Sequence, residues 1–480
     1  MPRSIGILSL HLSLVAATSN GYRAAYVEHQ TWSPCGQGSC GKEQNAASVQ
    51  AYDAYAEAAA LRGAQIIVFP EYGITGFSSY PKSTWISENY AEMIPPVSRV
   101  PVSVPCDSPK YFSATPSTVS LSCTARRHGI AVVANLMEYT RDGHMYNTDI
   151  VFDTTGAFLA KYRKLNLWGE GNVDVPPHCP ESTFTTSFNV TFGVFTCADL
   201  IYKFPASDLV ANGVRNFVVP VAWSNEMAQM QVMAYAQGWS LRHRVNLIVS
   251  NRKTTGESGS GIWASGWPLA FGYAPGRGQG RVTVAEVPDS IVGSSVLLAQ
   301  PFSSTFPQFR LDLVSNGKHW AFAELSQQRV CSGSICCAVS ERTGGDEGYV
   351  LAALDGPDSD EGSIHWPAKI CAVIPCRRPG FPCLKYQPAA GDLTTVTIRM
   401  SGVRSTLVVP EVLVTGSSQQ SLLEPGGGPD SLTFSSSEES AVLTARTTQA
   451  VLSAVVYGRS FADDRLPYTC PPQTPVILSV

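Results

Sequence analysis

Short, unbroken apolar runs alternate with segments of helical periodicity between residues 45 and 250, and this alternation constrains the fold more than any other feature. The apolar runs are residues 66–69, 130–136, 217–221 and 247–250. Runs with so few polar residues are typical of strands buried on both faces of a parallel sheet. Strands that alternate with helices predict a layered α/β domain of roughly 270 residues.

Local signals mark where individual elements begin and end. A helix over 45–62 has apolar residues at helical spacing, and Gly63 can terminate it. A second helix is predicted from Pro116 to His128, with Thr115 as its N-cap and Gly129 as its closing residue. The other elements that we predict here are strands 148–153, 158–163 and 189–196 and helices 206–212 and 226–243.

The character of the sequence changes near residue 290. Beyond it the chain is rich in Ser, Thr, Val and Gly, has short alternating runs such as 395–400, and carries seven of the 13 cysteines. This pattern predicts a second, disulfide-tied and mainly β domain, with a flexible loop over 416–440. We therefore divide the chain into a signal peptide (1–19), an α/β domain (20–290) and a β-rich C-terminal domain (291–480).

The N-terminus has the pattern of a secretory signal: Arg3, a short apolar region, and small residues around Ala16. A buried first strand is the alternative interpretation. Elsewhere no stretch is long enough for a membrane span, and the C-terminus lacks the apolar tail of a glycolipid anchor. The formal charge of −4, without a Lys/Arg cluster, argues against a nucleic-acid partner. We expect a secreted, extracellular protein.

The 13 cysteines suggest disulfides, and their odd number leaves at least one thiol unpaired. Cys35 and Cys40 bracket a Gly-rich loop and are expected to pair, because no second Cys/His pair nearby would complete a metal site. Adjacent Cys336 and Cys337 are expected to have different partners, since a bridge between neighbours is strained. The single sequon at Asn189 predicts a glycosylation site.

Three residues that suit acyl transfer follow predicted strands: Glu71, Lys164 and Cys197. A thiolate can attack a carbonyl, a glutamate can move the proton, and an ammonium can stabilise the oxyanion, together with the backbone N–H of Ala198. Each residue also has an ordinary explanation. Glu71 could cap a loop, Lys164 could be a solvated charge, and Cys197 could lie in the core or in a disulfide.

The segments that contain these residues resemble known signatures. Segments 69–77, 162–167 and 195–199 resemble the three signature elements of the carbon–nitrogen hydrolase (nitrilase) superfamily, in that family's order of Glu, Lys and Cys. Four further segments resemble the vanin (pantetheinase) and biotinidase branch: 24–29, 146–153, 259–263 and 330–337. The resemblance covers nearly the whole chain.

The resemblance implies a four-layer α/β/β/α sandwich followed by the β-rich domain. It also implies Glu71 as general base, Lys164 as oxyanion stabiliser and Cys197 as nucleophile, with no metal or organic cofactor. The reaction would hydrolyse a linear amide of a small molecule through a thioester. Pantetheine, giving pantothenate and cysteamine, is the favoured substrate, and biocytin, giving biotin and lysine, is the alternative. A catalytically silent binding protein of the same fold is the third interpretation.

Several residues near these segments are candidates for the substrate pocket: Tyr72, Trp168, Glu170, Asp199, Trp223 and Asn225. Glu170, six residues beyond Lys164, could orient the Lys164 ammonium or could instead lie in a surface loop, and we expect Ser224 to cap the following helix. Two departures from the branch lie nearby. Ala198 replaces a residue that is commonly aromatic, and segment 202–204 lacks the usual acidic residue. Substrate specificity therefore does not follow from the resemblance.

Overall fold

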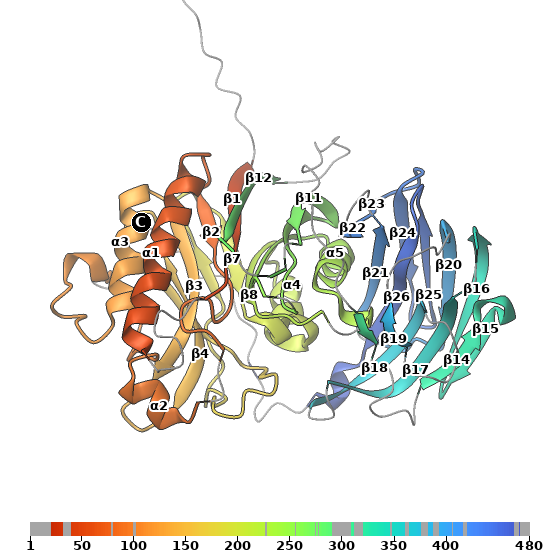
Figure 1. Cartoon of the computed structure of the whole chain (residues 1–480), viewed down its shortest axis with the longest axis horizontal. Helices are drawn as coiled ribbons and strands as arrows, with labels where there is room; N and C mark the ends of the chain where they lie inside the picture. Colours follow the sequence, from red (N-terminus) through yellow and green to blue (C-terminus); the bar gives the residue numbers. More distant parts are fainter. Residues whose placement is uncertain are drawn as a thin grey trace, which may run out of the picture.

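A computed structural model shows an α/β domain beside a β domain (Figure 1). The structure describes residues 21–470 except for the following: 32–39, 78–79, 99–101, 226–227, 255, 274, 277, 290–308, 312–319, 346–347, 361–363, 376–382, 387–392, 406, 416–419 and 465–469. The predicted signal peptide lies outside the described residues. None of the helices in the described part of the chain has the length and apolarity needed to cross a bilayer.

The first domain contains two six-stranded sheets. One has the order β12-β1-β2-β3-β4-β5 and the other β11-β10-β9-β8-β7-β6. The strands of the first sheet are β1 (Gly21–Glu28), β2 (Ile66–Val68), β3 (Ala131–Tyr139), β4 (Met145–Phe152), β5 (Phe158–Arg163) and β12 (Arg281–Pro288). Those of the second are β6 (Thr183–Thr185), β7 (Thr191–Val194), β8 (Asn216–Val221), β9 (Asn246–Asn251), β10 (Ser260–Ala264) and β11 (Trp267–Gly272).

Alternation along the strands explains the layers. Tyr26 and Val68 point into the core between the two sheets, whereas Val27 and Ile67 pack beneath helices on the outer face. Those helices are α1 (Gly41–Ala60) and α3 (Pro116–His128), with α2 (Lys82–Ser87) nearby; α4 (Asp208–Ala211) and α5 (Val232–His243) cover the second sheet (Figure 1). The predicted α/β/β/α sandwich is confirmed.

The second domain is a sandwich of two antiparallel six-stranded sheets, apart from one parallel pair. The inner sheet consists of β14 (Trp320–Glu324), β17 (Tyr349–Asp360), β18 (Ile364–Pro375), β26 (Val451–Arg459), β21 (Leu407–Thr415) and β22 (Gln420–Ser421). The outer sheet consists of β15 (Arg329–Ser332), β16 (Ile335–Thr343), β20 (Thr395–Ser401), β25 (Ser440–Arg446), β24 (Ser431–Ser436) and β23 (Glu424–Pro425); β13 (Phe309–Leu311) pairs with β19 (Cys383–Tyr386).

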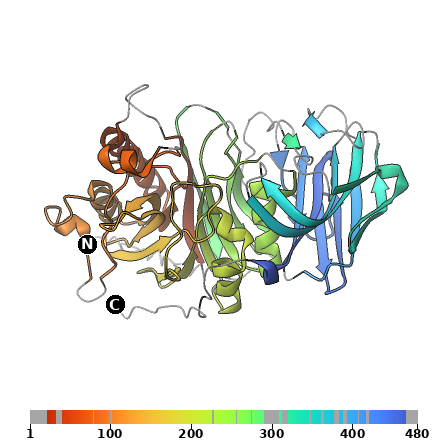
Figure 2. The same cartoon turned by 90° about the horizontal axis from the view of Figure 1, so that it is seen from below.

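The two domains pack closely (Figure 2). Alternate residues of β26 serve two cores: Ala454 and Val456 face the other sheet of the sandwich, while Val455 and Tyr457 join the core of the first domain. Helix α5 lies on β21, and Gln237 Nε2 donates a hydrogen bond to the Leu423 carbonyl at 2.6 Å. The inner sheet is therefore buried on both faces.

Four disulfides join described cysteines: Cys106–Cys123, Cys179–Cys470, Cys331–Cys336 and Cys337–Cys371. The different partners of Cys336 and Cys337 confirm the prediction. Cys40 is also disulfide-bonded. Among the described cysteines only Cys197 is free.

Some predicted elements were wrong. The helix expected from residue 226 begins at Val232, after a short 3₁₀ turn over Ala228–Met230, and the loop expected over 416–440 contains β22, β23 and β24. Short polar strands such as β24 alternate weakly, so their pattern resembles that of a loop. The strands β1, β6 and β10 to β12 were not predicted individually.

Candidate active site

Cys197 opens a five-residue 3₁₀ turn, Cys197–Ile201, which follows strand β7. Its φ of +47° lies in the left-handed region that side chains rarely adopt, so the surroundings must hold it there. Thr196 and Asp199 form a capping box across the start of the turn, and the Thr196 N–H donates to Asp199 Oδ2 at 3.0 Å. The turn thus presents the thiol from a firmly anchored backbone.

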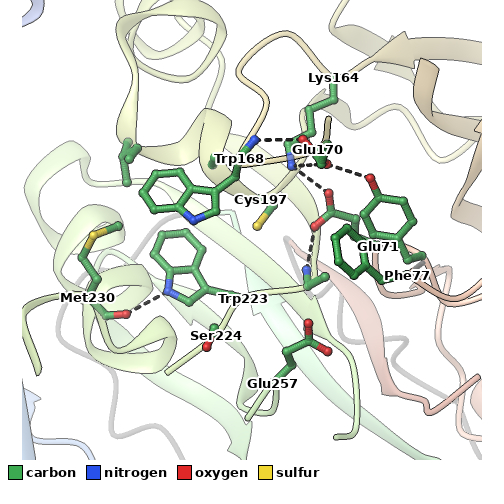
Figure 3. Close-up of a pocket in the computed structure, with 14 residues that line it drawn as sticks. Glu71, Phe77, Lys164, Trp168, Glu170, Cys197, Trp223, Ser224, Met230 and Glu257 are labelled. Atoms are coloured by element: carbon green, nitrogen blue, oxygen red, sulfur yellow. Dashed lines mark hydrogen bonds and ion pairs between the residues drawn. The ribbon is translucent and has the colours of Figure 1, made fainter. Parts of the chain in front are cut away.

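Lys164 follows β5 and lies between two carboxylates. Its Nζ donates to Glu71 Oε1 at 2.8 Å and to Glu170 Oε1 at 2.9 Å, and all three side chains are almost completely buried (Figure 3). Asn147 Nδ2, from β4, donates to the same two oxygens at 2.7 and 2.9 Å. The burial of three charges is tolerated because each finds charged and hydrogen-bonded partners.

The outer oxygens of the two carboxylates are also fixed. Glu71 Oε2 accepts the Ala222 N–H at 2.7 Å, and Glu170 Oε2 accepts the Trp168 N–H at 2.9 Å. The Tyr72 hydroxyl donates to Glu170 Oε1 at 2.7 Å. Glu71, at the end of the segment after β2, is therefore held in a single orientation.

Glu71, Lys164, Glu170 and Cys197 border one cavity of about 190 Å³. Its lining is mainly apolar and aromatic, and Figure 3 shows the Cys197 sulfur between the two indoles and Glu71. The lining residues are Glu71, Tyr72, Phe77, Lys164, Trp168, Glu170, Cys197, Ala198, Ile201, Ala222, Trp223, Ser224, Met230 and Glu257. A concave apolar site with a few convergent polar groups is typical of a small-molecule site.

The electrostatics favour a neutral thiol beside a charged pair. Burial raises the pKa of the Cys197 thiol, and the Glu71 carboxylate raises it further, against the opposing effect of Lys164. Burial alone would lower the pKa of Lys164, but the carboxylates of Glu170 and Glu71 overcome it and raise that pKa. The resting site accordingly holds a thiol and an ammonium, so the sulfur needs a base during attack.

Two of the predicted pocket residues lie elsewhere. Asp199 belongs to the turn itself and is fully buried, and its carboxylate accepts hydrogen bonds from Tyr162 and Asn166, so it braces the nucleophile turn instead. Asn225 holds the start of α5 from outside the helix, since its Oδ1 accepts the Val232 N–H at 3.0 Å; the N-cap position itself is Gln231. Ser224, expected to be the cap, lines the cavity. Because α5 begins at Val232, its N-cap is seven residues beyond the expected Ser224.

Several functional residues were missed. Asn147 lies within segment 146–153, but an asparagine inside a buried strand gave no separate signal. Phe77, Ile201, Met230 and Glu257 reach the cavity from turns and loops, whose positions periodicity does not predict. No group of three or more metal-ligating side chains occurs among the described residues.

Comparison with known proteins agrees with this arrangement. The profile of the carbon-nitrogen hydrolase family matches residues 23–259, and that of the vanin C-terminal domain matches residues 309–464. A pantetheinase of Bos taurus is 30% identical over 444 residues, covering 86% of this chain and 83% of that protein. The chain belongs to the vanin and biotinidase branch of the carbon–nitrogen hydrolase superfamily.

Other relatives of this vanin-type hydrolase include a biotinidase of Takifugu rubripes, 31% identical over 371 residues, covering 68% of this chain and 72% of that protein. An amidase structure from Nesterenkonia sp. is similar over 58% of this chain and 94% of its own, at 19% identity and a TM-score of 0.43. Membership of the family makes the chain a hydrolase of amide carbon–nitrogen bonds, and the resemblance drawn from its sequence is confirmed.

Proposed function

We propose that this protein is a secreted amidase that cleaves pantetheine to pantothenate and cysteamine, with Cys197 as nucleophile. The observation that carries the proposal is the placement of one free, buried cysteine in the same cavity as the Glu71–Lys164 pair. The described disulfides fit an oxidising, extracellular compartment. Asn189 is exposed in the turn before β7, a position that a glycan could reach.

In the first half-reaction the Cys197 sulfur attacks the carbonyl carbon of the amide while Glu71 takes the thiol proton. The carbonyl π electrons move to oxygen, and the Lys164 ammonium and the Ala198 N–H stabilise this oxyanion. Glu71 then returns the proton to the nitrogen as the carbon–nitrogen bond breaks. The amine leaves, and the acyl group remains as a thioester on Cys197.

In the second half-reaction a water enters and Glu71 takes one of its protons. The resulting hydroxide attacks the thioester carbonyl, and Lys164 and Ala198 again stabilise the oxyanion. Collapse breaks the carbon–sulfur bond, the acid leaves, and the sulfur recovers its proton from Glu71. Glu170 keeps Lys164 in position and Asn147 keeps Glu71 in position, and Asn147 also donates to Glu170.

Pantetheine is favoured over biocytin for two reasons. The Bos taurus pantetheinase matches 86% of this chain, whereas the biotinidases of Takifugu rubripes and Bos taurus match 68% and 75%. The small cavity, with Trp168 and Trp223 as walls, suits a linear acyl chain better than a fused bicyclic ring. Ala198 lines the cavity at a position that is commonly aromatic in this branch, so biocytin remains the alternative substrate.

The test is to measure cysteamine release from pantetheine and lysine release from biocytin by the purified protein. We expect turnover of pantetheine, loss of all turnover in Cys197→Ala, and an acyl adduct on Cys197 by intact mass under rapid quench. Equal product formation by the wild type and Cys197→Ala would refute the proposal. An adduct that persists without turnover would identify the silent binding protein instead.

A further inference from the structure

The second domain reaches the nucleophile turn through Arg459, the last residue of β26. Arg459 Nε donates to the Ile201 carbonyl at 3.1 Å, although the two residues are 258 positions apart. The guanidinium is fully buried, and its remaining nitrogens donate to the Pro367 carbonyl and to Asp464, each at 2.6 Å. The Arg459 Cζ atom lies 5.2 Å from the centre of the Tyr202 ring. Three hydrogen bonds, one from each nitrogen, fix the position of this buried cation.

The contact falls at a place where it affects the chemistry. Cys197 and Ala198 begin the turn, and Ile201, which also lines the cavity, ends it. The last carbonyls of a helical turn have no partner within the turn, and a cation there is favourable. Because the turn has only five residues, a shift at the Ile201 carbonyl also moves the thiol and the Ala198 N–H.

A second connection runs through aromatic rings. Trp168, one wall of the cavity, packs on Trp366 of β18 with ring centres 4.6 Å apart, and the Trp366 indole N–H donates to the Tyr457 hydroxyl. The Tyr457 ring packs against that of Tyr235 of α5, with ring centres 5.7 Å apart. The Tyr235 ring in turn packs against Trp223, with ring centres 5.6 Å apart. Trp223 also lines the cavity, beside Trp168 (Figure 3). Contacting aromatic rings of both domains therefore connect Trp168 to Trp223.

We propose that the second domain completes the active site, with Arg459 as a positioning residue for the nucleophile turn and Trp366 as a specificity-determining residue that sets the width of the cavity. The inference rests on the proposed role of Cys197. Neither residue touches the substrate. Arg459 acts through Ile201, and Trp366 acts through Trp168.

The test of Arg459 uses Arg459→Met and Arg459→Lys, with Arg446→Met as the control. Arg446 pairs with Glu341 on the exposed side of the same domain. Since small misplacements of reacting groups cost up to ~100-fold in rate, we expect kcat of Arg459→Met to fall about tenfold with KM within about twofold of wild type. Arg459→Lys should recover part of this loss, because it restores a cation and a donor.

A merely structural role predicts a different result. It would lower the melting temperature of Arg459→Met but leave kcat per folded molecule at the wild-type value, which would overturn the inference. The rate of Cys197 alkylation by iodoacetamide across pH is the second readout, since it needs no amide substrate. We expect its pH profile to shift in Arg459→Met and to stay in place in Arg446→Met.

The test of Trp366 compares Trp366→Leu with Trp320→Leu, a tryptophan of the same sheet whose ring stacks on Phe322. Loss of the Trp366 ring lets Trp168 move back, so we expect the ratio of kcat/KM for biocytin over pantetheine to rise about tenfold or more. An unchanged ratio would overturn this part of the inference.

The two proposals can fail separately. If the wild type hydrolyses neither amide, the proposed substrate is wrong, and the alkylation profile of Arg459→Met still decides the role of Arg459. If pantetheine is hydrolysed and the Arg459 and Trp366 variants behave like their controls, the proposed function stands and the contribution of the second domain is refuted.

Discussion

Asn147 shares both carboxylate oxygens that hold Lys164, and this contact distinguishes it from an ordinary strand residue. Its amide donates to Glu71 and Glu170 within 2.9 Å. Without it, Lys164 is the one partner of Glu71 Oε1 left among the described residues, so the carboxylate that must exchange a proton with sulfur is less well fixed. A carboxylate with greater freedom is a poorer general base, because catalysis requires a defined geometry.

We therefore expect Asn147→Ala to lower kcat about 10- to 100-fold, with a smaller change in KM, since the amide does not border the cavity. Steady-state kinetics on pantetheine would measure this effect. Asn212→Ala, at the end of α4, serves as the control and should match the wild type. Equal kcat values for the two variants would contradict the positioning role of Asn147.

The Cys197 thiol has a raised pKa, chiefly through burial, and this has a direct consequence for labelling. An unperturbed cysteine has a pKa of about 8.5. Because the pKa of Cys197 is higher, its alkylation rate should still be rising at pH 9. The measurement is the rate of iodoacetamide labelling between pH 6 and pH 10, with the site confirmed by mass mapping. A plateau below pH 7 would indicate a preformed thiolate instead.

At the scale of elements, the centre of β4 carries a buried acid that links the first sheet to the nucleophile turn. Asp149 accepts hydrogen bonds from Asn135 of β3 at 2.8 Å and from Thr196 at 2.7 Å. Burial raises its pKa to about 8, despite these donors, and the Glu71 and Asp199 carboxylates raise it as well. Asp149 therefore keeps its proton in the folded state at neutral pH.

The sign of the pH effect follows. The unfolded chain loses this proton near pH 4, whereas the folded protein keeps it up to about pH 8, so the folded state binds more protons within that window. The free energy of unfolding must fall as pH rises through it, by up to roughly 1.4 kcal/mol per pH unit for one such group.

Asp149→Asn mimics the protonated acid and removes this titration. We expect its melting temperature to decline less steeply than that of the wild type between pH 4 and pH 8. Glu28, whose pKa burial raises to about 7, still titrates in the variant, so part of the slope should persist. Thermal melts across this range measure the difference, and identical slopes would show that Asp149 is ionised in the folded protein.

How far the sequence predicts these elements depends on the range of the interactions involved. Glu71 and Cys197 could be found because each follows a short strand-like segment rich in apolar residues, and all three residues, Lys164 included, lie in segments that resemble the family signatures. Six residues separate Asn225 from Val232, and nothing in the sequence indicates that the helix begins only after them. Side chains that act across elements, such as Asn147, leave no periodic signal.

At the scale of the whole molecule, the packing of the two domains against each other was the least predictable feature. A disulfide-tied β domain could be expected from composition, but not its contact with the nucleophile turn. Arg459 and Ile201 are far apart in sequence, and an arginine at a strand end gives no indication of its partner. Cys179–Cys470 adds a covalent link between the first domain and the C-terminal segment, which connectivity rules do not predict from sequence.

Gly238 on α5 offers a direct test of this docking. A Cβ built there would lie 1.8 Å from the carbonyl oxygen of Pro410 on β21, so only glycine lets the helix approach the sheet this closely. Gly238→Ala must push α5 and β21 apart, even though alanine is the better helix former by about 1 kcal/mol. Overpacking of this kind typically costs about 1–3 kcal/mol, which outweighs the gain in helix propensity.

We expect Gly238→Ala to lower the melting temperature and to reduce activity, because the displaced sheet also carries Arg459 and Trp366. Gly427→Ala is the matched control, since a Cβ there meets nothing within 4 Å. Thermal melts together with kcat on pantetheine separate the two effects. If stability falls while kcat per folded molecule stays at the wild-type value, α5 docking is structural only. If both fall together, the position of the second domain governs the chemistry at Cys197.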